Sequence, residues 1–452
     1  MHRRATYRIL LFLIISFLHL PTVFADTVKD RQAQATPDLE IKNLNPGYST
    51  PNSEELTQGN RSTNLFLEPL RENLNHIDEY KTYYTEKQGI NSQIIDTNSA
   101  IEPHYKDNET ALKAVERNLL LYTNRLKNTF KIWIERSGRY IDIMRNILKE
   151  RGLPEELVFL PIVESGFNPH AYSPAKAVGP WQFISDTAKR YGLIIDWWRD
   201  ERKDPVKSTQ AAASYLKDLY RMFGSWNLSL AAYNAGEGRI LRSLKRSGEN
   251  DYWALMEKKH IPQETRDYVP RYIAATKIIQ NPEEYGFYNL DYHEPFEYEE
   301  VIIDSPIDID LVARCAETTV SVIRELNPEL RRWSTPPGIP YYKLRIPKGT
   351  KERFFENLKN VPKNKWFSFD TYKVKKGDTL KKISKKTGFP VSVIIALNSF
   401  SGVEQLKAGT LIRIPPRDKY IPDRDDKRIA KVSYKKGGKK KSATTNKRSK
   451  RA

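Results

Sequence analysis

The amino-acid sequence predicts a multidomain protein, in which a mainly α domain is followed by small α+β modules with the element order βααβ. Its 452 residues exceed the size that a single hydrophobic core usually organises. Apolar residues recur at helical spacing across residues 109–290, whereas beyond residue 298 short strand-like runs alternate with pairs of helical runs. We therefore expect one helical domain with small mixed modules after it.

Residues 1–25 have the composition of an export signal peptide. Three arginines precede the apolar run ILLFLIISFLHL, and the following TVFAD offers small residues that suit signal-peptidase cleavage. The run is short for a span of the bilayer. The only cysteine, Cys315, lies deep in the chain, which excludes an intrachain disulfide and a lipid-modified cysteine at the cleavage site. We expect an exported protein of the periplasm or cell envelope that is not a lipoprotein.

The net charge of +19 is concentrated towards one end of the chain. Residues 431–452 hold ten Lys or Arg and no acid, and we interpret residues 417–452 as a flexible basic tail. Within 431–452 the only aromatic residue is Tyr434, so we expect no nucleic acid partner and instead weak binding to an anionic envelope surface. Residues 26–108, rich in Asn, Ser, Thr and Pro, are interpreted as a low-complexity spacer.

The helical domain, residues 109–290, contains several amphipathic segments in succession. One of them ends at Gly152, and Pro154 with two acids opens a short helix whose far end carries Glu164. The segments WNLSLAAY and ETRDYVPRYIAATKII are also predicted to be helical. Ser208 is predicted to cap a further helix, whose apolar face would consist of Tyr215, Leu216, Leu219, Tyr220 and Phe223.

Glu164 is an isolated carboxylate in the stretch LPIVESGF, among apolar and small residues. Burial without a partner raises the pKa of a carboxyl group, so such a residue is either a general acid or a helix-end carboxylate that binds backbone amides. Glycoside hydrolysis usually needs two carboxylates. The spacing leaves open which further acid approaches it among Glu155, Glu156, Asp186, Asp196, Asp204, Glu237, Glu264 and Asp267.

Four ordered motifs point to one family. ES followed by FNP and a Ser, then GPWQF, AAYNAGEGRI and ETRDYVPRYI, resemble the motifs of the family 1 lytic transglycosylases, whose soluble-lytic-transglycosylase domain has a goose-lysozyme-like fold. Within it, the membrane-bound murein transglycosylase D subfamily is the most similar. The resemblance implies cleavage of the β-1,4 bond between N-acetylmuramic acid and N-acetylglucosamine without water, in which the 6-hydroxyl attacks the anomeric carbon and leaves a 1,6-anhydro end.

The same resemblance implies roles for individual residues. Glu164 would protonate the glycosidic oxygen and then, as a carboxylate, accept the proton of the 6-hydroxyl. The implied substrate-binding residues are Ser173, Gln182, Tyr233, Asn234, Glu264 and Tyr268. Structural alternatives remain open, because Ser and Gln also cap helices, Tyr233 could be a core aromatic residue, and Glu264 could be a charge at a helix N-terminus.

Other chemistries lack their residues in this sequence. No HExxH motif occurs and one cysteine cannot form a thiolate cluster, so we expect no metal, and the GEG of NAGEGR does not follow a strand, so we expect no cofactor. Two alternatives to the transglycosylase stay open. One is a muramidase of the same fold, in which Glu237, Glu264 or Asp267 would hold a hydrolytic water. The other is a wall-binding protein without catalytic activity.

Residues 371–416 form a second recognisable unit. A strand at Tyr372–Val374, a helix capped at Asp378, a helix after Pro390 and a closing strand at Leu411–Ile414 are predicted. With YxVxxGDTL, ALN and IRIP in place, this unit resembles a LysM domain. The resemblance implies a groove for glycans that contain N-acetylglucosamine, lined by Gly377, Asp378, Thr379 and the stretch from Asn398 to Leu406.

An internal repeat indicates a related unit over residues 298–349. TTVSVIRELNP parallels FPVSVIIALNS, and YKLRIPKGT parallels GTLIRIPPR. This divergent LysM-like unit lacks the GDTL turn and carries a PPGIP insertion, so it is interpreted either as a glycan-binding module or as a packing module between the two other domains. Residues 350–370 are interpreted as a linker.

Overall fold

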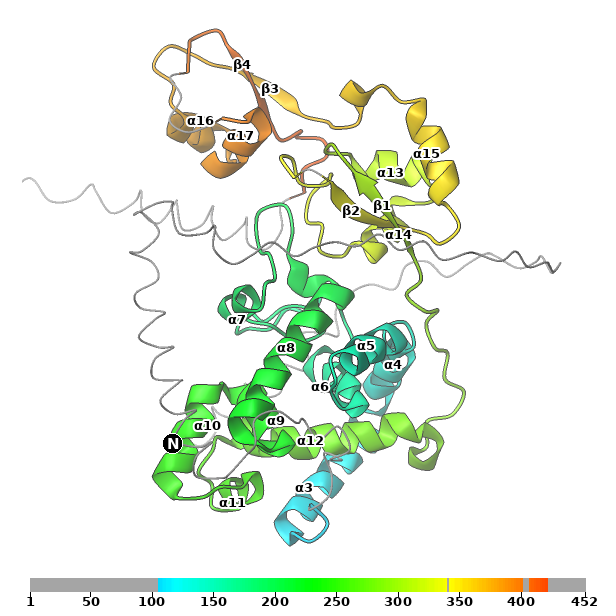
Figure 1. The fold of residues 1–452 in the computed structure, drawn as a ribbon, viewed down its shortest axis with the longest axis vertical. Coiled ribbons are helices and arrows are strands. Elements are labelled where there is room, and N and C mark those ends of the chain that lie inside the picture. Colours follow the sequence, from blue (N-terminus) through cyan, green and yellow to red (C-terminus); the bar gives the residue numbers. More distant parts are fainter. Residues whose placement is uncertain (1–104, 340, 401–405, 422–452) are drawn as a thin grey trace, which may run out of the picture. The chain divides into compact units, whose positions relative to one another are not determined.

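The computed structural model describes residues 105–339, 341–400 and 406–421 (Figure 1). All of these residues belong to one compact unit of the chain. The predicted signal peptide, residues 26–104 of the predicted spacer and the tail beyond residue 421 lie outside the described residues. Within the described ranges, no helix combines the length and the apolar character that crossing a membrane requires.

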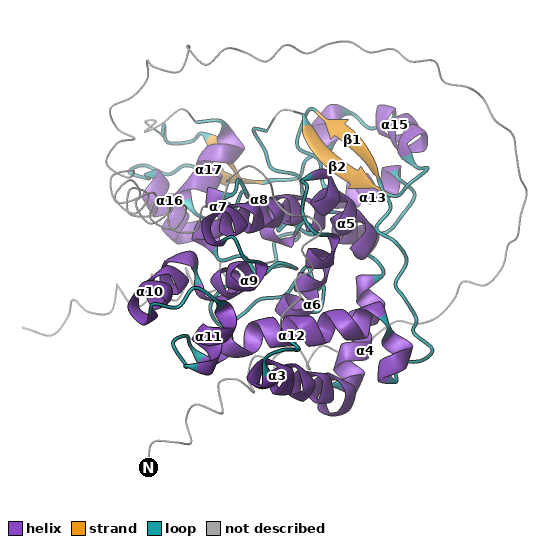
Figure 2. Cartoon of the chain, turned by 60° about the horizontal axis from the view of Figure 1, so that its bottom comes forward, coloured by secondary structure: helices purple, strands orange, loops and turns teal. Residues whose placement is uncertain are grey.

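The first part of the described chain is helical, as predicted for residues 109–290 (Figure 2). Short 3-10 turns at Glu155–Phe159, Glu201–Lys203 and Pro282–Tyr285 and a π turn at Leu121–Arg125 interrupt the regular helices. The α-helices are α3 (Glu109–Leu120), α4 (Lys127–Ser137), α5 (Ile141–Glu150), α6 (Leu160–Ser165), α7 (Ser185–Arg190), α8 (Pro205–Phe223), α9 (Trp226–Ala235), α10 (Glu237–Ser247), α11 (Tyr252–Glu257) and α12 (Gln263–Gln280).

Helix α8 begins earlier than the sequence analysis predicted. Asp204, and not Ser208, is its N-cap residue, and the Asp204 side chain accepts hydrogen bonds from the backbone N–H groups of Val206 and Lys207. Pro205 at the first helical position favours this start because its fixed φ suits a helix and its missing N–H needs no partner there. Ser208 lies inside the helix and donates its hydroxyl to the Asp204 carbonyl.

Helix α12 contacts α3, α9 and α6 and contains a proline (Figure 1). Pro270 has no N–H to offer the carbonyl of Arg266, four residues before it. The buried hydroxyl of Tyr252 donates to that carbonyl at 2.9 Å and lies 3.0 Å from the carbonyl oxygen of Thr265. The helix therefore continues through Pro270, because a side chain of α11 satisfies the carbonyl that the proline leaves without a partner.

The end of α6 is determined by Gly166. This residue adopts the left-handed conformation, with φ of 60°, and terminates the helix directly after Glu164 and Ser165. A Cβ atom at this position would lie 2.3 Å from a ring carbon of Trp133, so the site has no space for a side chain. The close approach to Trp133 on α4 fixes where the helix end that carries Glu164 lies.

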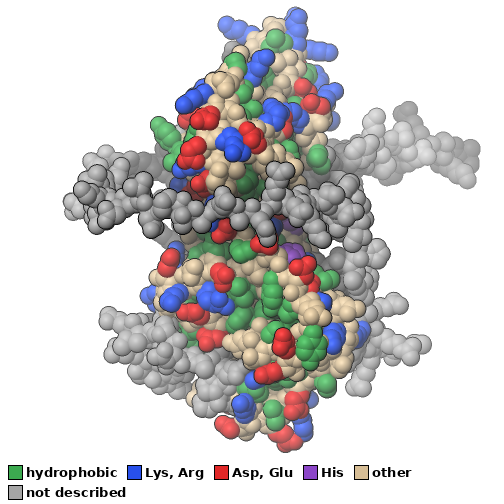
Figure 3. All heavy atoms as spheres, turned by 90° about the vertical axis from the view of Figure 1, so that its right-hand side faces the viewer, with side chains coloured by type: hydrophobic (Ala, Val, Ile, Leu, Met, Phe, Trp, Pro, Cys, Tyr) green, Lys and Arg blue, Asp and Glu red, His purple; other side chains and the backbone are tan. Residues whose placement is uncertain are grey.

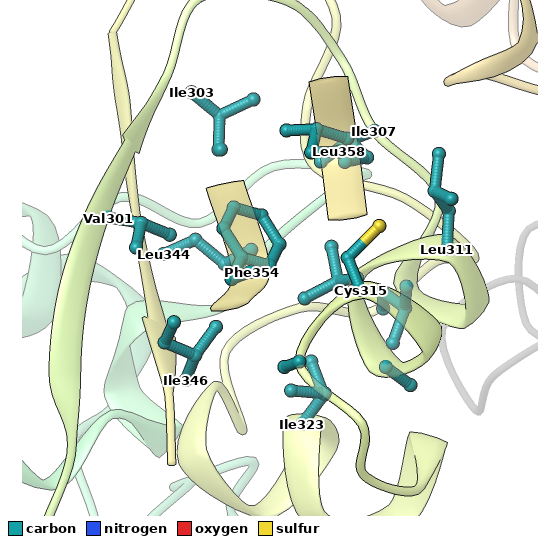
Figure 4. Close-up of a cluster of buried hydrophobic side chains, with 14 of the residues drawn as sticks. Val301, Ile303, Ile307, Leu311, Cys315, Ile323, Leu344, Ile346, Phe354 and Leu358 are labelled. Carbon is teal, nitrogen blue, oxygen red and sulfur yellow. The ribbon is translucent and has the colours of Figure 1, made fainter. Parts of the chain in front are cut away.

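The LysM-like module has the βααβ order that the sequence predicts, with an additional helix. Strand β1 (Glu299–Ile303) pairs antiparallel with β2 (Tyr342–Ile346), with Val301 opposite Leu344. Between the strands lie α13 (Ile309–Cys315) and α14 (Val320–Leu326). Figure 4 shows the core side chains of this module, which come from both strands, from α13 and α14, and from α15.

The prediction of a linker over residues 350–370 is wrong for its first part, because Lys351–Lys359 form helix α15. Phe354 and Leu358 of this helix are buried in the same core cluster as Val301 and Leu344 (Figure 4). Burying two large apolar side chains stabilises a small module that two short strands and two helices would leave with little core. The first part of the predicted linker is therefore part of the LysM-like module.

The second module pairs β3 (Asp370–Lys373) with β4 (Leu411–Ile414) and contains α16 (Leu380–Thr387) and α17 (Val391–Asn398). The closing strand and the helix after Pro390 agree with the prediction. The first strand begins two residues earlier than predicted. The predicted cap Asp378 is wrong, because the hydroxyl of Thr379 accepts the hydrogen bond from the Lys382 N–H at the start of α16.

The predicted internal repeat is confirmed by a shared set of hydrogen bonds, which we call the Asn clip. In the first module, Asn327 donates to the carbonyl of Arg345 (2.7 Å) and accepts from its N–H (2.9 Å). In the second module, Asn398 makes the same two bonds with Arg413, at 2.8 and 2.7 Å. Each clip joins the end of the second helix to the closing strand, so the two modules share their internal construction.

Side chains of both signs are interspersed over the face of the molecule drawn in Figure 3, where Lys and Arg alternate with Asp and Glu. Lys and Arg side chains are prominent at the upper end of this face.

We expect the substitution Gly166→Ala to lower the free energy of unfolding by about 3 kcal/mol, since it adds a left-handed alanine and an overlap with Trp133. Gly152→Ala is the matched control, because Gly152 is also left-handed (φ 65°) but has no atom within 4 Å of the added methyl group. The control should lose only about 1 kcal/mol. Denaturant unfolding measures both, and equal losses would contradict the predicted contact with Trp133.

Candidate active site

Glu164 lies one residue before the end of α6, where it meets α12. The hydroxyl of Tyr268 donates a hydrogen bond to Oε1 of Glu164. The two residues are 104 positions apart in the sequence, so this contact joins two helices that the chain forms separately. Glu164 keeps part of its surface accessible, whereas Tyr268 is buried. The carboxyl group is therefore held in one orientation while it remains within reach of a bound molecule.

Burial raises the pKa of Glu164 to about 7. The hydrogen bond from Tyr268 and the positive charge of Arg271 oppose this shift, and the negative charge of Glu264 adds to it. Near neutral pH a carboxyl group with this pKa exists in both protonation states. It can therefore donate a proton in one step and accept a proton in the next.

Three of these groups lie on one face of α12. Glu264, Tyr268 and Arg271 are spaced four and three residues apart, which places their side chains on the same side of the helix. The sequence analysis predicted this segment to be helical, and helical spacing then places Glu264 and Tyr268 on one face. Arg271 was not predicted as a site residue, although its spacing from Tyr268 is the same signal.

The GPWQF motif forms a tight loop beside this helix pair. Gln182 adopts a left-handed backbone, with φ of 49°, and its side-chain amide donates to the carbonyl of Gly179 at 2.9 Å. The carbonyl of Trp181 accepts a hydrogen bond from the hydroxyl of Tyr233 at 2.7 Å. The charge of Glu164 is among the causes that raise the pKa of Tyr233, after burial. Gln182 and Tyr233 thus belong to one connected part of the site.

Ser165 was missed by the sequence analysis as a residue with a role of its own. Its hydroxyl donates to the carbonyl of Pro180 at 2.9 Å and accepts from the backbone N–H of Asn168 at 3.1 Å. It therefore connects the end of α6 to the loop that contains Gln182. The signal was present in the quoted ES motif, directly next to the acid.

Ser173 and Asn234 make contacts within the protein. The hydroxyl of Ser173 accepts from the N–H of Ala177 at 3.0 Å, which closes a tight turn before the GPWQF loop. The side-chain oxygen of Asn234 accepts from the hydroxyl of Thr265 at 3.0 Å, which connects α9 to the start of α12. No hydrogen bond that the structure describes joins either residue to Glu164.

Two of the acids considered for a hydrolytic water are engaged elsewhere. Glu237 accepts from Arg190 at 2.9 Å and from the hydroxyl of Tyr215 at 3.0 Å, and its pKa is lowered, although burial opposes the effect of these partners. Asp267 pairs with Arg117 and accepts from Gln263. Glu264 alone of the three acts on the pKa of Glu164.

The described residues that are predicted to bind glycan in the LysM module lie in the turn after β3, at the end of α17 and before β4. Asp378 accepts hydrogen bonds from Lys386, Tyr372 and the N–H of Lys375, and the hydrogen bond from Lys386 is the largest cause that lowers its pKa to about 2. Its carboxylate therefore shapes the turn after β3. Gly377, with φ of 78°, allows the same turn, and no atom lies within 4 Å of a Cβ placed there.

The other residues predicted for this groove have structural partners. Thr379 caps α16, Asn398 forms the Asn clip with Arg413, and Leu406 packs against the core of the module. Residues 401–405 of the predicted groove lie outside the described residues. The described part of the predicted groove thus includes a capped turn and the end of α17.

Comparison with known protein families identifies three regions of the chain. A model described as the transglycosylase SLT domain matches residues 143–256. A model of the LysM-like domain of lytic transglycosylase MltD matches residues 297–363, and a LysM domain model matches residues 372–415. The second match includes helix α15, in agreement with the core in which this helix lies.

Comparison with individual proteins gives related results. Membrane-bound lytic murein transglycosylase D of Escherichia coli (strain K12) is 34% identical over 294 residues, which are 62% of this chain and 64% of that protein. Soluble lytic murein transglycosylase of the same organism is 31% identical over 156 residues, covering 32% of this chain and 24% of that protein. The chain thus aligns with less than two thirds of the length of these relatives.

Among solved structures, the complex of a 70-kDa soluble lytic transglycosylase with bulgecin A matches at 28% identity and a TM-score of 0.29, covering 32% of this chain and 24% of that one. A TM-score this low supports no argument of its own.

The fold and the site together define a protein with a helical domain, a partly buried acid near a helix end, and two βααβ modules after that domain. The chain contains a region that matches the transglycosylase SLT domain, followed by two regions that match LysM-type modules. Its first module is of the LysM-like type described for lytic transglycosylase MltD.

The raised pKa of Glu164 predicts a dependence of stability on pH. Because the folded protein holds the proton more tightly than the unfolded chain, the stabilisation is complete below the ordinary glutamate pKa of 4.5 and is lost as the pH rises to about 7. The loss is on the order of 3 kcal/mol. Burial raises the pKa of Glu329 in the same way, so wild type must be compared with Glu164→Gln.

The difference between the unfolding free energies of the two proteins, measured by denaturant titration at several pH values, should change within this window. In the variant, the part of the decline due to Glu164 should be absent. Parallel curves for the two proteins would show that the environment of Glu164 does not raise its pKa.

Proposed function

We propose that this protein is a peptidoglycan lytic transglycosylase that cleaves the β-1,4 bond between N-acetylmuramic acid and N-acetylglucosamine. The observation that carries the proposal is the enclosed carboxyl group of Glu164, with a pKa near 7 and a hydrogen bond from Tyr268. The family matches and the similarity to murein transglycosylases support the same activity.

In the first step, protonated Glu164 donates its proton to the glycosidic oxygen, and the bond from that oxygen to the anomeric carbon of the muramic acid breaks. The hydroxyl of Tyr268 keeps the carboxyl group oriented during this transfer. In the second step, the carboxylate accepts the proton of the 6-hydroxyl as the hydroxyl oxygen bonds to the anomeric carbon. Glu164 returns to its acid form, and a 1,6-anhydro ring closes without water.

An internal nucleophile explains why one carboxyl group suffices. The 6-hydroxyl belongs to the same sugar, so its effective concentration at the anomeric carbon far exceeds that of a bound water. In this mechanism the site has to exclude water, and the buried Trp181 and Phe183 are suited to that. A hydrolytic muramidase remains the rival, with Glu264 as the acid that would hold the water.

The remaining predicted site residues are proposed to bind the glycan around Glu164. Gln182 lies in the GPWQF loop, Tyr233 and Asn234 lie on α9, and Glu264 lies on the face of α12 that carries Tyr268. Ser173 is proposed to contact the sugar from the turn that it closes.

We propose that the LysM module holds the enzyme on the wall through the turn at Gly377, Asp378 and Thr379 and the stretch from Asn398 to Leu406. The LysM family match supports this role. The proposed site of action is the periplasmic peptidoglycan of the cell envelope, which the predicted export signal and the LysM family match favour. Anionic envelope surfaces are proposed as weak partners of the basic tail.

The central test is the substitution Glu164→Gln, assayed on purified peptidoglycan. The amide keeps the shape of the side chain but cannot donate the proton, so cleavage should fall by at least about 1,000-fold while circular dichroism stays unchanged. Wild-type products analysed by mass spectrometry should be lighter by one water than hydrolysis products. They should contain no oxygen from heavy-oxygen water.

Reducing muramic acid ends that carry heavy oxygen would establish hydrolysis instead, and Glu264→Gln would then be tested as the variant that loses the water. A folded Glu164→Gln protein with wild-type activity would remove Glu164 from the mechanism. Wild-type protein that binds the wall but releases no soluble product would favour a wall-binding protein without catalytic activity.

The proposed roles of the two modules, wall binding by the LysM module and packing by the LysM-like module, lead to a second prediction. Residues 371–416, expressed alone, should sediment with insoluble peptidoglycan, because Val374, Ile383, Ile394 and Ile412 form a core of this module's own. Residues 297–366, expressed alone, are the matched control with the same Asn clip and should stay in solution. Equal sedimentation of the two folded fragments would show that both modules bind glycan.

A further inference from the structure

The two modules differ at one position that their repeat makes directly comparable. Arg413, the arginine of the second Asn clip, is exposed, and its guanidinium lies 4.5 Å from the ring centroid of Phe369, the residue before β3. The side chain of Arg345, the corresponding arginine, is only 7% exposed and donates to both carboxylate oxygens of Asp204, at 2.8 and 3.2 Å. The LysM-like module therefore uses this position for a buried ion pair with the helical domain.

The same surface of the LysM-like module binds the backbone of the helical domain. We call residues 194–204, which lead into α8, the supported segment. The N–H of Asp200 donates to the carbonyl of Glu329 at 2.9 Å, and the N–H of Arg331 donates to the carbonyl of Trp198 at 2.8 Å. Arg199 pairs with Leu330 as an isolated antiparallel bridge. Such backbone pairing fixes the register as well as the position of the supported segment.

Apolar and cation–π contacts cover this junction. Trp198 packs in one buried cluster with Trp333 of the LysM-like module and with Val393 and Leu397 of the second module. The guanidinium of Arg332 lies 3.9 Å from the ring centroid of Trp197. The junction thus combines a buried charge pair, backbone hydrogen bonds and an apolar cluster, as a permanent interface does.

Inside the helical domain, the supported segment holds the GPWQF loop through Arg202. The guanidinium of Arg202 pairs with Asp200 at 2.8 Å and donates to the carbonyls of Lys176 and Phe183 at 3.1 and 3.2 Å. The first carbonyl lies three residues before the GPWQF loop, and the second belongs to its last residue. Arg202 is buried, so water does not compete for its hydrogen bonds.

Gly179 brings the loop into direct contact with the supported segment. A Cβ atom at Gly179 would lie 1.8 Å from the carbonyl oxygen of Arg202, so only a glycine permits this approach. The next two residues, Pro180 and Trp181, accept the hydrogen bonds from Ser165 and Tyr233 that were described for the site. A displacement of the supported segment would therefore reach the end of α6 that carries Glu164.

A second route runs through Asp204 itself. The carboxylate that pairs with Arg345 also caps α8, and the Thr209 hydroxyl in the second turn of α8 accepts the hydrogen bond of the Trp181 indole N–H at 2.8 Å. Both routes lead from the LysM-like module to the GPWQF loop.

From these contacts we infer that the LysM-like module is a fixed part of the catalytic unit, which positions the GPWQF loop through Arg345 and Arg202. This inference rests on the proposed function, because it assigns the loop a part in catalysis. Arg345 and Arg202 act as positioning residues, since they reach the site only through the loop and through Asp204.

The test compares Arg345→Met with Arg413→Met in the full chain, since both remove one guanidinium next to the same Asn clip. Turnover of soluble glycan strands is measured together with hydrogen exchange of the peptide that covers residues 171–184. Arg345→Met should lower kcat roughly tenfold and leave KM within about twofold, because a small displacement of a positioned group costs rate more than binding. Exchange should become faster in this peptide but not in peptides from α10 and α11.

Arg413→Met should match wild type in both measurements, and Arg345→Lys should recover part of kcat because it restores the charge without the bidentate geometry. If circular dichroism shows that Arg345→Met is unfolded, the same two measurements on Arg345→Lys and Asp204→Asn test the inference instead. The Asn side chain at position 204 still has the oxygen that caps α8. Hydrogen exchange needs no turnover, so it tests the coupling even if the proposed activity fails. A folded Arg345 variant with wild-type kcat and wild-type exchange in residues 171–184 would overturn the inference.

Discussion

The hydrogen bond between Tyr268 and Glu164 joins α12 to the end of α6, and the candidate site of the helical domain is built around it. A carboxyl group enclosed at a helix end costs free energy unless its orientation and its protonation are controlled. Gly166 fixes where α6 ends, α12 supplies the hydroxyl, and Ser165 joins the end of α6 to the GPWQF loop. The function proposed for the protein uses this control of protonation. An acid that is neither fully charged nor fully neutral near pH 7 can both donate and accept a proton.

Much of this arrangement follows from patterns in the sequence. Helical periodicity places Glu264 and Tyr268 on one face of α12, and the repeat of the ALN and IRIP motifs is reproduced by the two Asn clips. The predicted cap at Ser208 was wrong because Asp204 followed by Pro205 is the stronger start signal, and both Asp204 and Ser208 are compatible with the apolar pattern of α8. Local patterns thus determined which elements form, and errors arose where two local signals competed.

Long-range partners could not be predicted from the same patterns. Asp204 and Arg345 are 141 residues apart, and each has an ordinary local setting that gives no sign of the other. Likewise, Glu237 lies in a motif next to the site but binds Arg190 and Tyr215 instead of Glu164. Residues 350–370 were interpreted as a linker because a short amphipathic helix with two core residues resembles a charged connecting segment in composition. Whether such a segment is a helix or a linker depends on whether its apolar side chains are buried in the folded protein.

The pairing of Pro270 with Tyr252 has a consequence for how the sequence of this protein can change. A proline inside α12 is compatible with the fold only while a hydroxyl from α11 satisfies the carbonyl of Arg266. Replacing Tyr252 by Phe alone leaves a buried carbonyl without a partner, whereas a residue with an N–H at position 270 makes the hydroxyl dispensable. Substitutions at positions 252 and 270 are therefore coupled, and we expect related sequences that lack one of these two residues to lack the other as well.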